Sequence, residues 1–193
     1  MSARMEELAT EIVRLQAELD REIEARRRAL GIEISGRIVG FEQGVLHAQR
    51  RLRVSFGRFV AQSELGSWLT APVIYSLIVP LLIIDVWVSL YQAICFRAYR
   101  IDRVRRSDYI LFDRNHLAYL NRVEAINCLF CAYANGLIGF VREVSSRTEQ
   151  YWCPIKHALR VHDPLHRYYE FLEYGDADGY RARLAEFRDR LRA

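Results

Sequence analysis

The sequence feature that constrains this chain most is an apolar segment of 29 residues, Trp68–Phe96, in which Asp85 is the only residue charged at neutral pH. An α-helix rises about 1.5 Å per residue, so about 20 apolar residues cross the ~30 Å hydrocarbon core of a bilayer. Trp68 near one end, with Trp87 and Tyr91 towards the other, is typical of aromatic anchors at a membrane interface. The segment therefore predicts an all-α, mainly helical membrane protein.

Arginines flank the apolar segment on both sides, and basic flanks favour the cytoplasmic face of a membrane. They are Arg50, Arg51, Arg53 and Arg58 upstream, and Arg97, Arg100, Arg103, Arg105, Arg106 and Arg114 downstream. A single crossing would separate the two clusters, so we favour a re-entrant hairpin that bends near Pro80 over a single span. Each arm of such a hairpin would reach only about 22 Å, so it would enter the membrane without crossing it.

Patterning divides the chain into four parts. We expect an amphipathic helical arm at 1–63, the membrane segment at 64–97, a cytoplasmic Cys/His domain at 98–175, and an amphipathic C-terminal helix at 176–193. Within the Cys/His domain, a short extended segment is predicted at 107–114 and a long helix at 123–147. Gly136 and Gly139 are expected either to weaken this helix or to let another part of the chain approach it closely. Asp178 is the expected N-cap of the last helix.

The N-terminal arm carries two apolar stripes at helical spacing. The first comprises Met5, Leu8, Ile12, Leu15 and Leu19, and the second, after a break near Gly31, comprises Ile34, Ile38, Phe41, Val45, Ala48, Leu52, Phe56 and Phe59. Two helices of this kind would pack on each other as a hairpin or bind a partner, so residues 5–60 are a candidate surface for self-association or for another protein.

The most specific chemical pattern is C-x2-C-x21-C-x3-H, formed by Cys128, Cys131, Cys153 and His157. Three thiolates and one imidazole supply the four ligands of a tetrahedral zinc site, and they could also hold an iron–sulfur cluster. Four protein ligands leave no open position for water, so a structural role fits better than hydrolysis. The alternative is that the thiols only pack in a membrane-proximal core.

Asp85 is a second candidate, because a carboxylate at the centre of a membrane helix costs about 2.5–3.5 kcal/mol on insertion scales. It would serve a proton or substrate site, or else lie near an interface. Other polar clusters match no ligand signature. They are Asp108, Asp113, His116 and Glu124, expected in solvated loops; His162, Asp163 and His166, a second metal patch or a polar loop; and Arg142, Glu143, Arg147 and Glu149, expected as helix-face charges.

The chain has a net charge of +4, and all but one of its basic residues are arginine, Lys156 being the exception. Arginine binds phosphate with two parallel hydrogen bonds, which suits anionic lipid or nucleic acid, although a coding bias would give the same ratio. Since no nucleic-acid motif is present, the expected partner is the lipid bilayer, with anionic lipids bound through the arginine clusters. The N-terminus lacks a signal peptide pattern, so we expect both termini in the reducing cytoplasm.

Three runs carry a resemblance to a known group of sequences. They are Arg106-Ser-Asp-Tyr-Ile110, Asn127-Cys-Leu-Phe-Cys-Ala-Tyr-Ala-Asn-Gly136 and Arg147-Thr-Glu-Gln-Tyr-Trp-Cys-Pro-Ile-Lys-His157. With them the chain resembles an uncharacterised family of small bacterial membrane proteins, over roughly residues 68–175. The resemblance implies a bacterial inner membrane and no catalytic residue.

These expectations lead to a non-catalytic accessory, assembly or scaffold protein of the inner membrane, with a structural Cys3His site on the cytoplasmic face. A first alternative is a membrane-bound iron–sulfur or iron redox enzyme that acts on a lipid-soluble substrate. A second alternative is a lipid-binding or membrane-shaping protein without metal.

Overall fold

The fold is taken from a computed structural model, which describes residues 3–30, 32–35, 38–41, 43–114, 117–162 and 164–192. The chain forms two compact units. The first unit combines Met1–Ser63 with Asp113–Leu129, and the second combines Glu64–Phe112 with Phe130–Ala193. The molecule is mostly helical, as the sequence predicted, with one small β-hairpin.

The first unit begins with a long exposed helix, α1 (Ala3–Ala29), which confirms the helix predicted from the first apolar stripe. Strands β1 (Ile32–Ser35) and β2 (Ile38–Phe41) follow and pair antiparallel, with Ile32 opposite Phe41 and Ser35 opposite Ile38. Two short helices complete this part, α2 (Gln43–Arg51) and α3 (Phe56–Gln62).

The prediction of one continuous second helix in the arm is therefore wrong. Residues 32–35 and 38–41 form the paired strands, and the remaining part of the stripe is divided between α2 and α3. The β-branched residues Ile32, Ile34, Ile38 and Val39 favour strands, and this preference prevails over the 3–4 spacing of the stripe.

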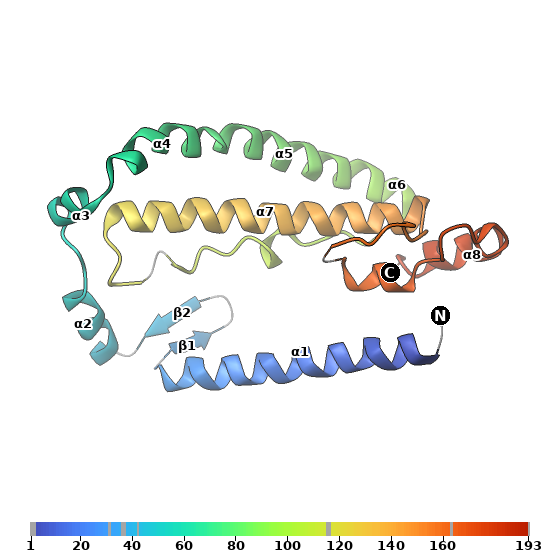
Figure 1. Ribbon diagram of the computed structural model, residues 1–193, viewed down its shortest axis with the longest axis horizontal. Helices are drawn as coiled ribbons and strands as arrows, with labels where there is room; N and C mark the ends of the chain where they lie inside the picture. The colour runs from blue at the N-terminus through green and yellow to red at the C-terminus, as the bar shows by residue number, and fades with distance from the viewer. Residues whose placement is uncertain are drawn as a thin grey trace. The chain divides into compact units, whose positions relative to one another are not determined.

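The second unit contains the long apolar helix. Four consecutive helical pieces make it up: α4 (Leu65–Ser76), α5 (Ile78–Tyr91), a π-helical turn (Gln92–Phe96) and α6 (Arg97–Tyr99). Together they run without reversal over Leu65–Tyr99, as Figure 1 shows.

The hairpin bend predicted near Pro80 is thus wrong. Pro80 is the third residue of α5, and proline is tolerated in the first turn of a helix, where backbone N–H groups need no partner within the helix. The backbone stays helical across the junction, because Leu77 keeps right-handed helical dihedrals and its N–H donates to Ile74 O and Tyr75 O.

A second long helix, α7 (Arg122–Trp152), enters the second unit at Phe130 and confirms the long helix expected there. It runs parallel to α4–α6 (Figure 1), since Tyr75 contacts Phe130 with ring centroids 5.7 Å apart, and further along Tyr99 contacts Tyr151 at 5.0 Å. Because the two long helices point the same way, the chain between them must run back along them. Residues 100–112 do so, with a 3-10 turn at Arg106–Asp108, and are called the returning segment below.

The main core of the second unit lies where the apolar helix, the returning segment and α7 meet. Its buried residues are Phe96, Ile101, Val104, Ile110, Tyr133, Leu137, Phe140, Val144 and Leu191. The returning segment reaches α7 at Gly136, where an added Cβ would lie 2.5 Å from Tyr109 O. The close approach expected from the glycines of this helix is confirmed.

The C-terminal end adds a 3-10 turn (His166–Glu170) and α8 (Ala177–Asp189). The predicted final helix is confirmed, but its N-cap is Asp176, whose side chain accepts a hydrogen bond from the Gly179 N–H. Phe171, Leu172 and Phe187 form a small second core beneath α8.

Candidate functional site: an apolar helix beside a buried ion-pair network

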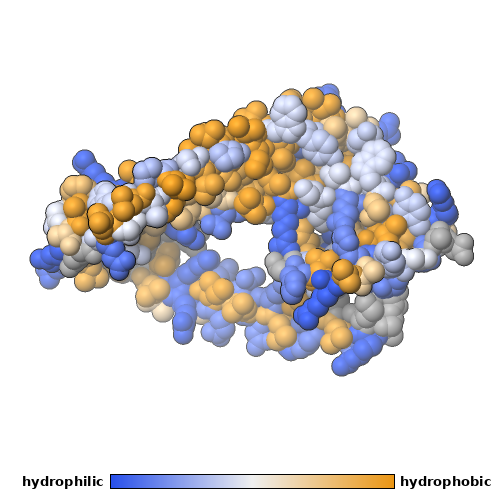
Figure 2. All heavy atoms as spheres, turned by 45° about the horizontal axis from the view of Figure 1, so that its top comes forward, coloured by the Kyte–Doolittle hydropathy of each residue, from blue (hydrophilic) through white to orange (hydrophobic). Residues whose placement is uncertain are grey.

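The most distinctive surface of the protein is the apolar face of α4 and α5. Among the residues that the structure describes, two helices are long and apolar enough to cross a membrane by length and composition alone, Leu65–Tyr99 and Arg122–Trp152. In the most apolar 18-residue window of each helix, no residue of the first helix is buried, whereas 22% of the window is buried in the second. Figure 2 shows apolar side chains gathered along this helix.

The exposure changes along the helix. Leu65–Ile84 contains no charged residue, and α4 has no buried residue among those described. From Ile78 onwards one side of the helix packs on the core, through Ile78, Leu81 and Val88, and the other side stays apolar and exposed. The exposed side comprises Val79, Ile83, Val86, Trp87, Leu90 and Ile94, with Trp87 71% accessible.

Asp85 is the first buried residue along the described part of this helix. Its side chain accepts hydrogen bonds from Arg106 Nε at 2.9 Å, Arg106 Nη2 at 2.5 Å and the Tyr133 hydroxyl at 2.9 Å. The residue is 8% exposed, so its carboxylate is buried and paired. The bond to Asp85 raises the pKa of the Arg106 guanidinium above its usual value. This arrangement fixes the returning segment to α5, which is a structural role for the predicted membrane carboxylate.

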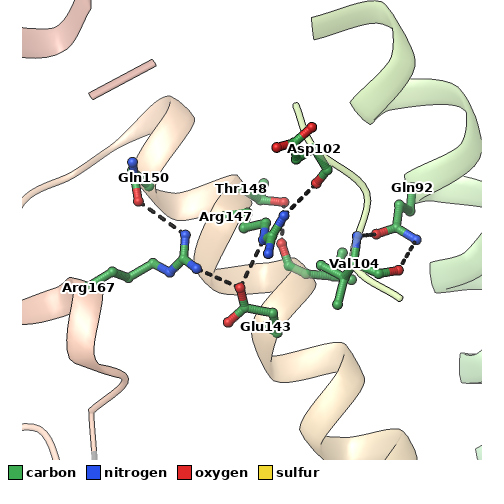
Figure 3. A network of polar contacts seen from close by, with 9 residues as sticks. Gln92, Asp102, Val104, Glu143, Arg147, Thr148, Gln150 and Arg167 are labelled. Carbon is green, nitrogen blue, oxygen red and sulfur yellow. Dashed lines mark hydrogen bonds and ion pairs between the residues drawn. The ribbon is translucent and has the colours of Figure 1, made fainter. Parts of the chain in front are cut away.

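Two turns further on, the side-chain amide of Gln92 holds the same segment. Its Nε2 donates to Val104 O at 3.2 Å, and its Oε1 accepts from Val104 N–H at 2.6 Å (Figure 3). Gln92 opens the π-helical turn of the apolar helix, and it is 3% exposed. The Gln92 amide therefore pairs with both the N–H and the C=O of Val104, as a neighbouring strand would.

On α7, a buried carboxylate joins two arginines. Glu143 Oε1 accepts from Arg147 Nε at 2.8 Å and from Arg167 Nη2 at 2.5 Å (Figure 3). Arg147 also donates to Asp102 O at 2.7 Å, and Arg167 to Gln150 Oε1 at 3.2 Å. The network connects the returning segment, α7 and the C-terminal region.

Burial lowers the pKa of Arg167, and the neighbouring Glu143 carboxylate opposes that shift. An arginine remains charged at any pH at which a protein folds, so the Arg167 guanidinium is a permanent buried charge beside Glu143. The Nε of Arg167 is buried without a hydrogen-bond partner among the described residues. Such a pair is costly to break on one side only, because the other charge is then left without compensation.

A basic hollow of about 640 Å³ lies at the end of the apolar helix. Its lining residues are Ala93, Phe96, Arg97, Arg100, Ile101, Asp102, Arg103 and Arg192. Arg100 caps the helix with left-handed dihedrals (φ 56°, ψ 42°), and the N–H of Asp102 donates to Leu191 O at 3.0 Å. This bond brings the end of the chain beside the returning segment.

The four predicted metal ligands lie at separate places. Cys128 and Cys131 are one turn apart on α7, whereas Cys153 follows the end of that helix and His157 lies in the next loop. The helical stretch from Cys131 to Trp152 has a length of about 31 Å. No group of three or more His, Cys, Asp or Glu side chains that could hold a metal ion occurs among the described residues. The structure therefore does not bring the four ligands together.

His157 lies instead in a polar hollow of about 410 Å³ against α7. Its other lining residues are Arg142, Ser145, Ser146, Glu149, Val161, His162, Pro164, Leu165 and Tyr168. The His157 ring stacks on Tyr168, with ring centroids 6.3 Å apart, and the His157 N–H donates to the Tyr168 hydroxyl at 2.7 Å.

The remaining polar candidates do not converge. Asp108 and Asp113 are exposed, and Glu124 accepts from Asn121 N–H at the start of α7. His116 and Asp163 lie outside the described residues, as does the side chain of His166.

Two functional features were missed by the sequence reasoning. Glu143 and Arg147 were interpreted as helix-face charges, although Glu143 lies beside the buried stripe Leu137, Phe140 and Val144 and could have been placed at its edge. The participation of Arg192 in the basic hollow depends on a tertiary contact, for which the sequence holds no local signal.

No family model, no curated protein and no solved structure matches the chain. The functional argument therefore depends on the geometry of the chain itself.

Proposed function

We propose that this is a non-catalytic membrane protein that attaches to one face of a bilayer through α4 and α5 and serves as a scaffold or accessory protein there. The observation that carries the proposal is the uncharged stretch Leu65–Ile84, whose side chains are almost all exposed. Monomeric soluble proteins rarely expose apolar patches larger than a few hundred Å², so a surface of this extent favours insertion into lipid.

Two observations favour attachment from one side over crossing. Gln49 before the apolar helix and Ala118 after it belong to the same unit, where the Ala118 N–H donates to Gln49 Oε1 at 3.4 Å. A crossing at Leu65–Ile84 alone would place these two residues on opposite sides of the membrane. One-sided attachment also puts both arginine flanks on one face, which agrees with the charge pattern.

The parallel arrangement of the two long helices supports the same topology. If both α4–α5 and α7 crossed, the returning segment would have to cross as well. That segment is not helical, and its exposed residues include Arg103, Arg105 and Asp108. Backbone that is not helical, with charges exposed to lipid, is not found in the hydrocarbon region.

The scaffold part of the proposal rests on α1. Its apolar stripe is exposed along about four turns, at Leu8, Ile12, Leu15, Leu19 and Ile23. Exposed apolar residues at this spacing suit a partner helix, from a second copy or from another protein. The cytoplasmic face of a bacterial inner membrane, with its anionic lipids, is the location that the arginines favour.

Attachment is tested by flotation of the purified full chain with neutral phosphatidylcholine vesicles, followed by a carbonate wash. The double variant Val73→Asp/Leu77→Asp places two charges in the exposed middle of the apolar stretch. Each buried charge costs about 2.5–3.5 kcal/mol, so the variant should leave the vesicle fraction. Leu15→Asp/Leu19→Asp on α1 is the matched control and should still float. Retention of the first variant on washed vesicles would show that α4 and α5 are not the attachment.

Topology is tested by labelling with a membrane-impermeant thiol reagent in sealed vesicles. The native cysteines are replaced by serine, and Ser55→Cys or Ser107→Cys is introduced in exposed positions on either side of the apolar helix. One-sided attachment predicts that both sites label from the same side. Labelling of only one site from that side would establish a crossing.

A further inference from the structure

We propose that the basic hollow lined by Arg97, Arg100, Arg103 and Arg192 binds the phosphate headgroup of an anionic phospholipid. This inference rests on the proposed membrane attachment and names the lipid class that the attached protein prefers. The four arginines come from α6, its C-terminal cap, the returning segment and the end of the chain. Arg192 therefore joins the other three, which are close in sequence, only in the folded protein.

The charge of the hollow favours an anion. Asp102 is the single acidic residue among its lining residues, which leaves a formal charge of +3 from four arginines and one carboxylate. The side chains of Arg97, Arg100 and Arg103 make no hydrogen bond or ion pair with any described residue, whereas Arg192 pairs with Asp189 at 2.8 Å. Three guanidinium groups are thus available, and each can bind phosphate through two hydrogen bonds.

The backbone around the hollow is held in place by other contacts. The C=O of Asp102 accepts from Arg147, and its N–H donates to Leu191 O, so the chain on either side is fixed. Arg100 adopts a left-handed conformation, which is unfavourable for a non-glycine residue and which the packed surroundings maintain. The arginine side chains are free to bind, while the backbone that presents them is ordered.

The neighbouring surface identifies a lipid as the source of the phosphate. The exposed apolar stripe of α5 continues through Trp87, Leu90 and Ile94, and Arg97 follows on the same face one turn later. In a membrane-attached protein this stripe contacts acyl chains, so the hollow next to it lies at the depth of the headgroups. An apolar contact followed by a phosphate contact is the pattern of a phospholipid.

The test compares apparent affinities of the full chain for two kinds of vesicle, phosphatidylcholine alone and phosphatidylcholine with about one-third phosphatidylglycerol. An arginine near an anionic membrane surface contributes about fivefold in affinity, so three arginines together should give a preference of roughly 100-fold. The variant Arg97→Gln/Arg100→Gln/Arg103→Gln should lose most of it. The control Arg26→Gln/Arg27→Gln/Arg28→Gln removes the same charge from the end of α1 and should keep it to within about threefold.

Affinity for neutral vesicles tests the attachment, and the ratio between the two vesicle types tests the hollow. Normal binding to neutral vesicles with an unchanged preference in the hollow variant would overturn the headgroup site and leave the attachment standing. Failure of the wild-type chain to bind neutral vesicles would overturn the attachment and, with it, this inference.

Inorganic phosphate separates a headgroup from a soluble ligand. The probe is sodium phosphate, compared with sodium chloride at equal ionic strength, and the readout is thermal stability. Stabilisation of the wild-type chain but not of the hollow variant, without a preference for anionic vesicles, would assign the hollow to a soluble phosphate and overturn the lipid. Circular dichroism checks the fold of the variant, and the single Arg103→Gln, expected to lose about fivefold, gives a second measure that disturbs the chain less.

Discussion

At Gly136 of α7, adding a single methyl group should cause a large loss of stability. An added Cβ there would lie 2.5 Å from Tyr109 O and 2.8 Å from Ile110 Cα, both backbone atoms of the returning segment. Ordinary contact begins at 3.4 Å, so the segment would have to withdraw by about 1 Å along a stretch that Asp85 and Gln92 hold in place.

The magnitude for Gly136→Ala follows from two opposing terms. Overpacking against backbone costs about 1–3 kcal/mol, and the upper end applies because no flexible side chain can move aside. Alanine recovers about 1 kcal/mol of helix propensity. The net expectation is a loss of about 2 kcal/mol in the free energy of unfolding, equivalent to a fall of about 4–8 °C in Tm for a chain of this length.

The assay is thermal and urea unfolding in a mild detergent, followed by circular dichroism. Gly139→Ala, one turn away on the same helix, is the matched control, because its Cβ would meet only a carbon of the Tyr109 ring at 3.2 Å. We expect that variant to stay within about 0.5 kcal/mol of the wild type, since the ring can shift and the propensity gain offsets the contact. A Gly136→Ala protein at least as stable as Gly139→Ala would refute the close packing of the returning segment on α7.

Two further predictions concern the buried network and the thiols. Glu143→Ala should lower the free energy of unfolding by about 3–5 kcal/mol, because Arg167 is left buried without its counter-charge. The control Glu186→Ala removes only exposed ion pairs and should cost less than about 1 kcal/mol. Equal losses in urea unfolding would contradict a buried ion pair at Glu143. Cys131→Ser/Cys153→Ser should change stability by no more than about 0.5 kcal/mol, because the two thiols do not share a site. The check is elemental mass spectrometry of the wild-type chain and the variant. About one zinc or iron per wild-type chain, absent from the variant, would show that the Cys3His site exists after all.

Features that depend on local periodicity could be predicted from the sequence. The 3–4 spacing in α1 and the apolar composition of Trp68–Phe96 each predict helix, whatever the rest of the chain does. The glycines of α7 correctly signalled a close approach, although not which segment approaches.

Features that depend on the path of the chain between two motifs could not be predicted. The spacing between Cys131 and Cys153 is compatible with a metal site only if the chain folds back, and here those residues are an unbroken helix. Pro80 illustrates the reverse error. A proline in the middle of an apolar segment suggests a bend, but its effect depends on where the helical turn begins, and Pro80 falls in the first turn of α5.

The returning segment also bears on the order in which the protein forms during synthesis. Gln92 and Val104 are only 12 residues apart in the chain, and Phe96 packs with Ile101, so these contacts are available before α7 has been made. Contacts of short sequence separation form early, and chains fold from the N-terminal side as they emerge. Under the proposed membrane attachment, the apolar helix and its returning segment would meet the bilayer while the face that α7 later covers is still open. Early delivery to the membrane would then be the step that limits aggregation.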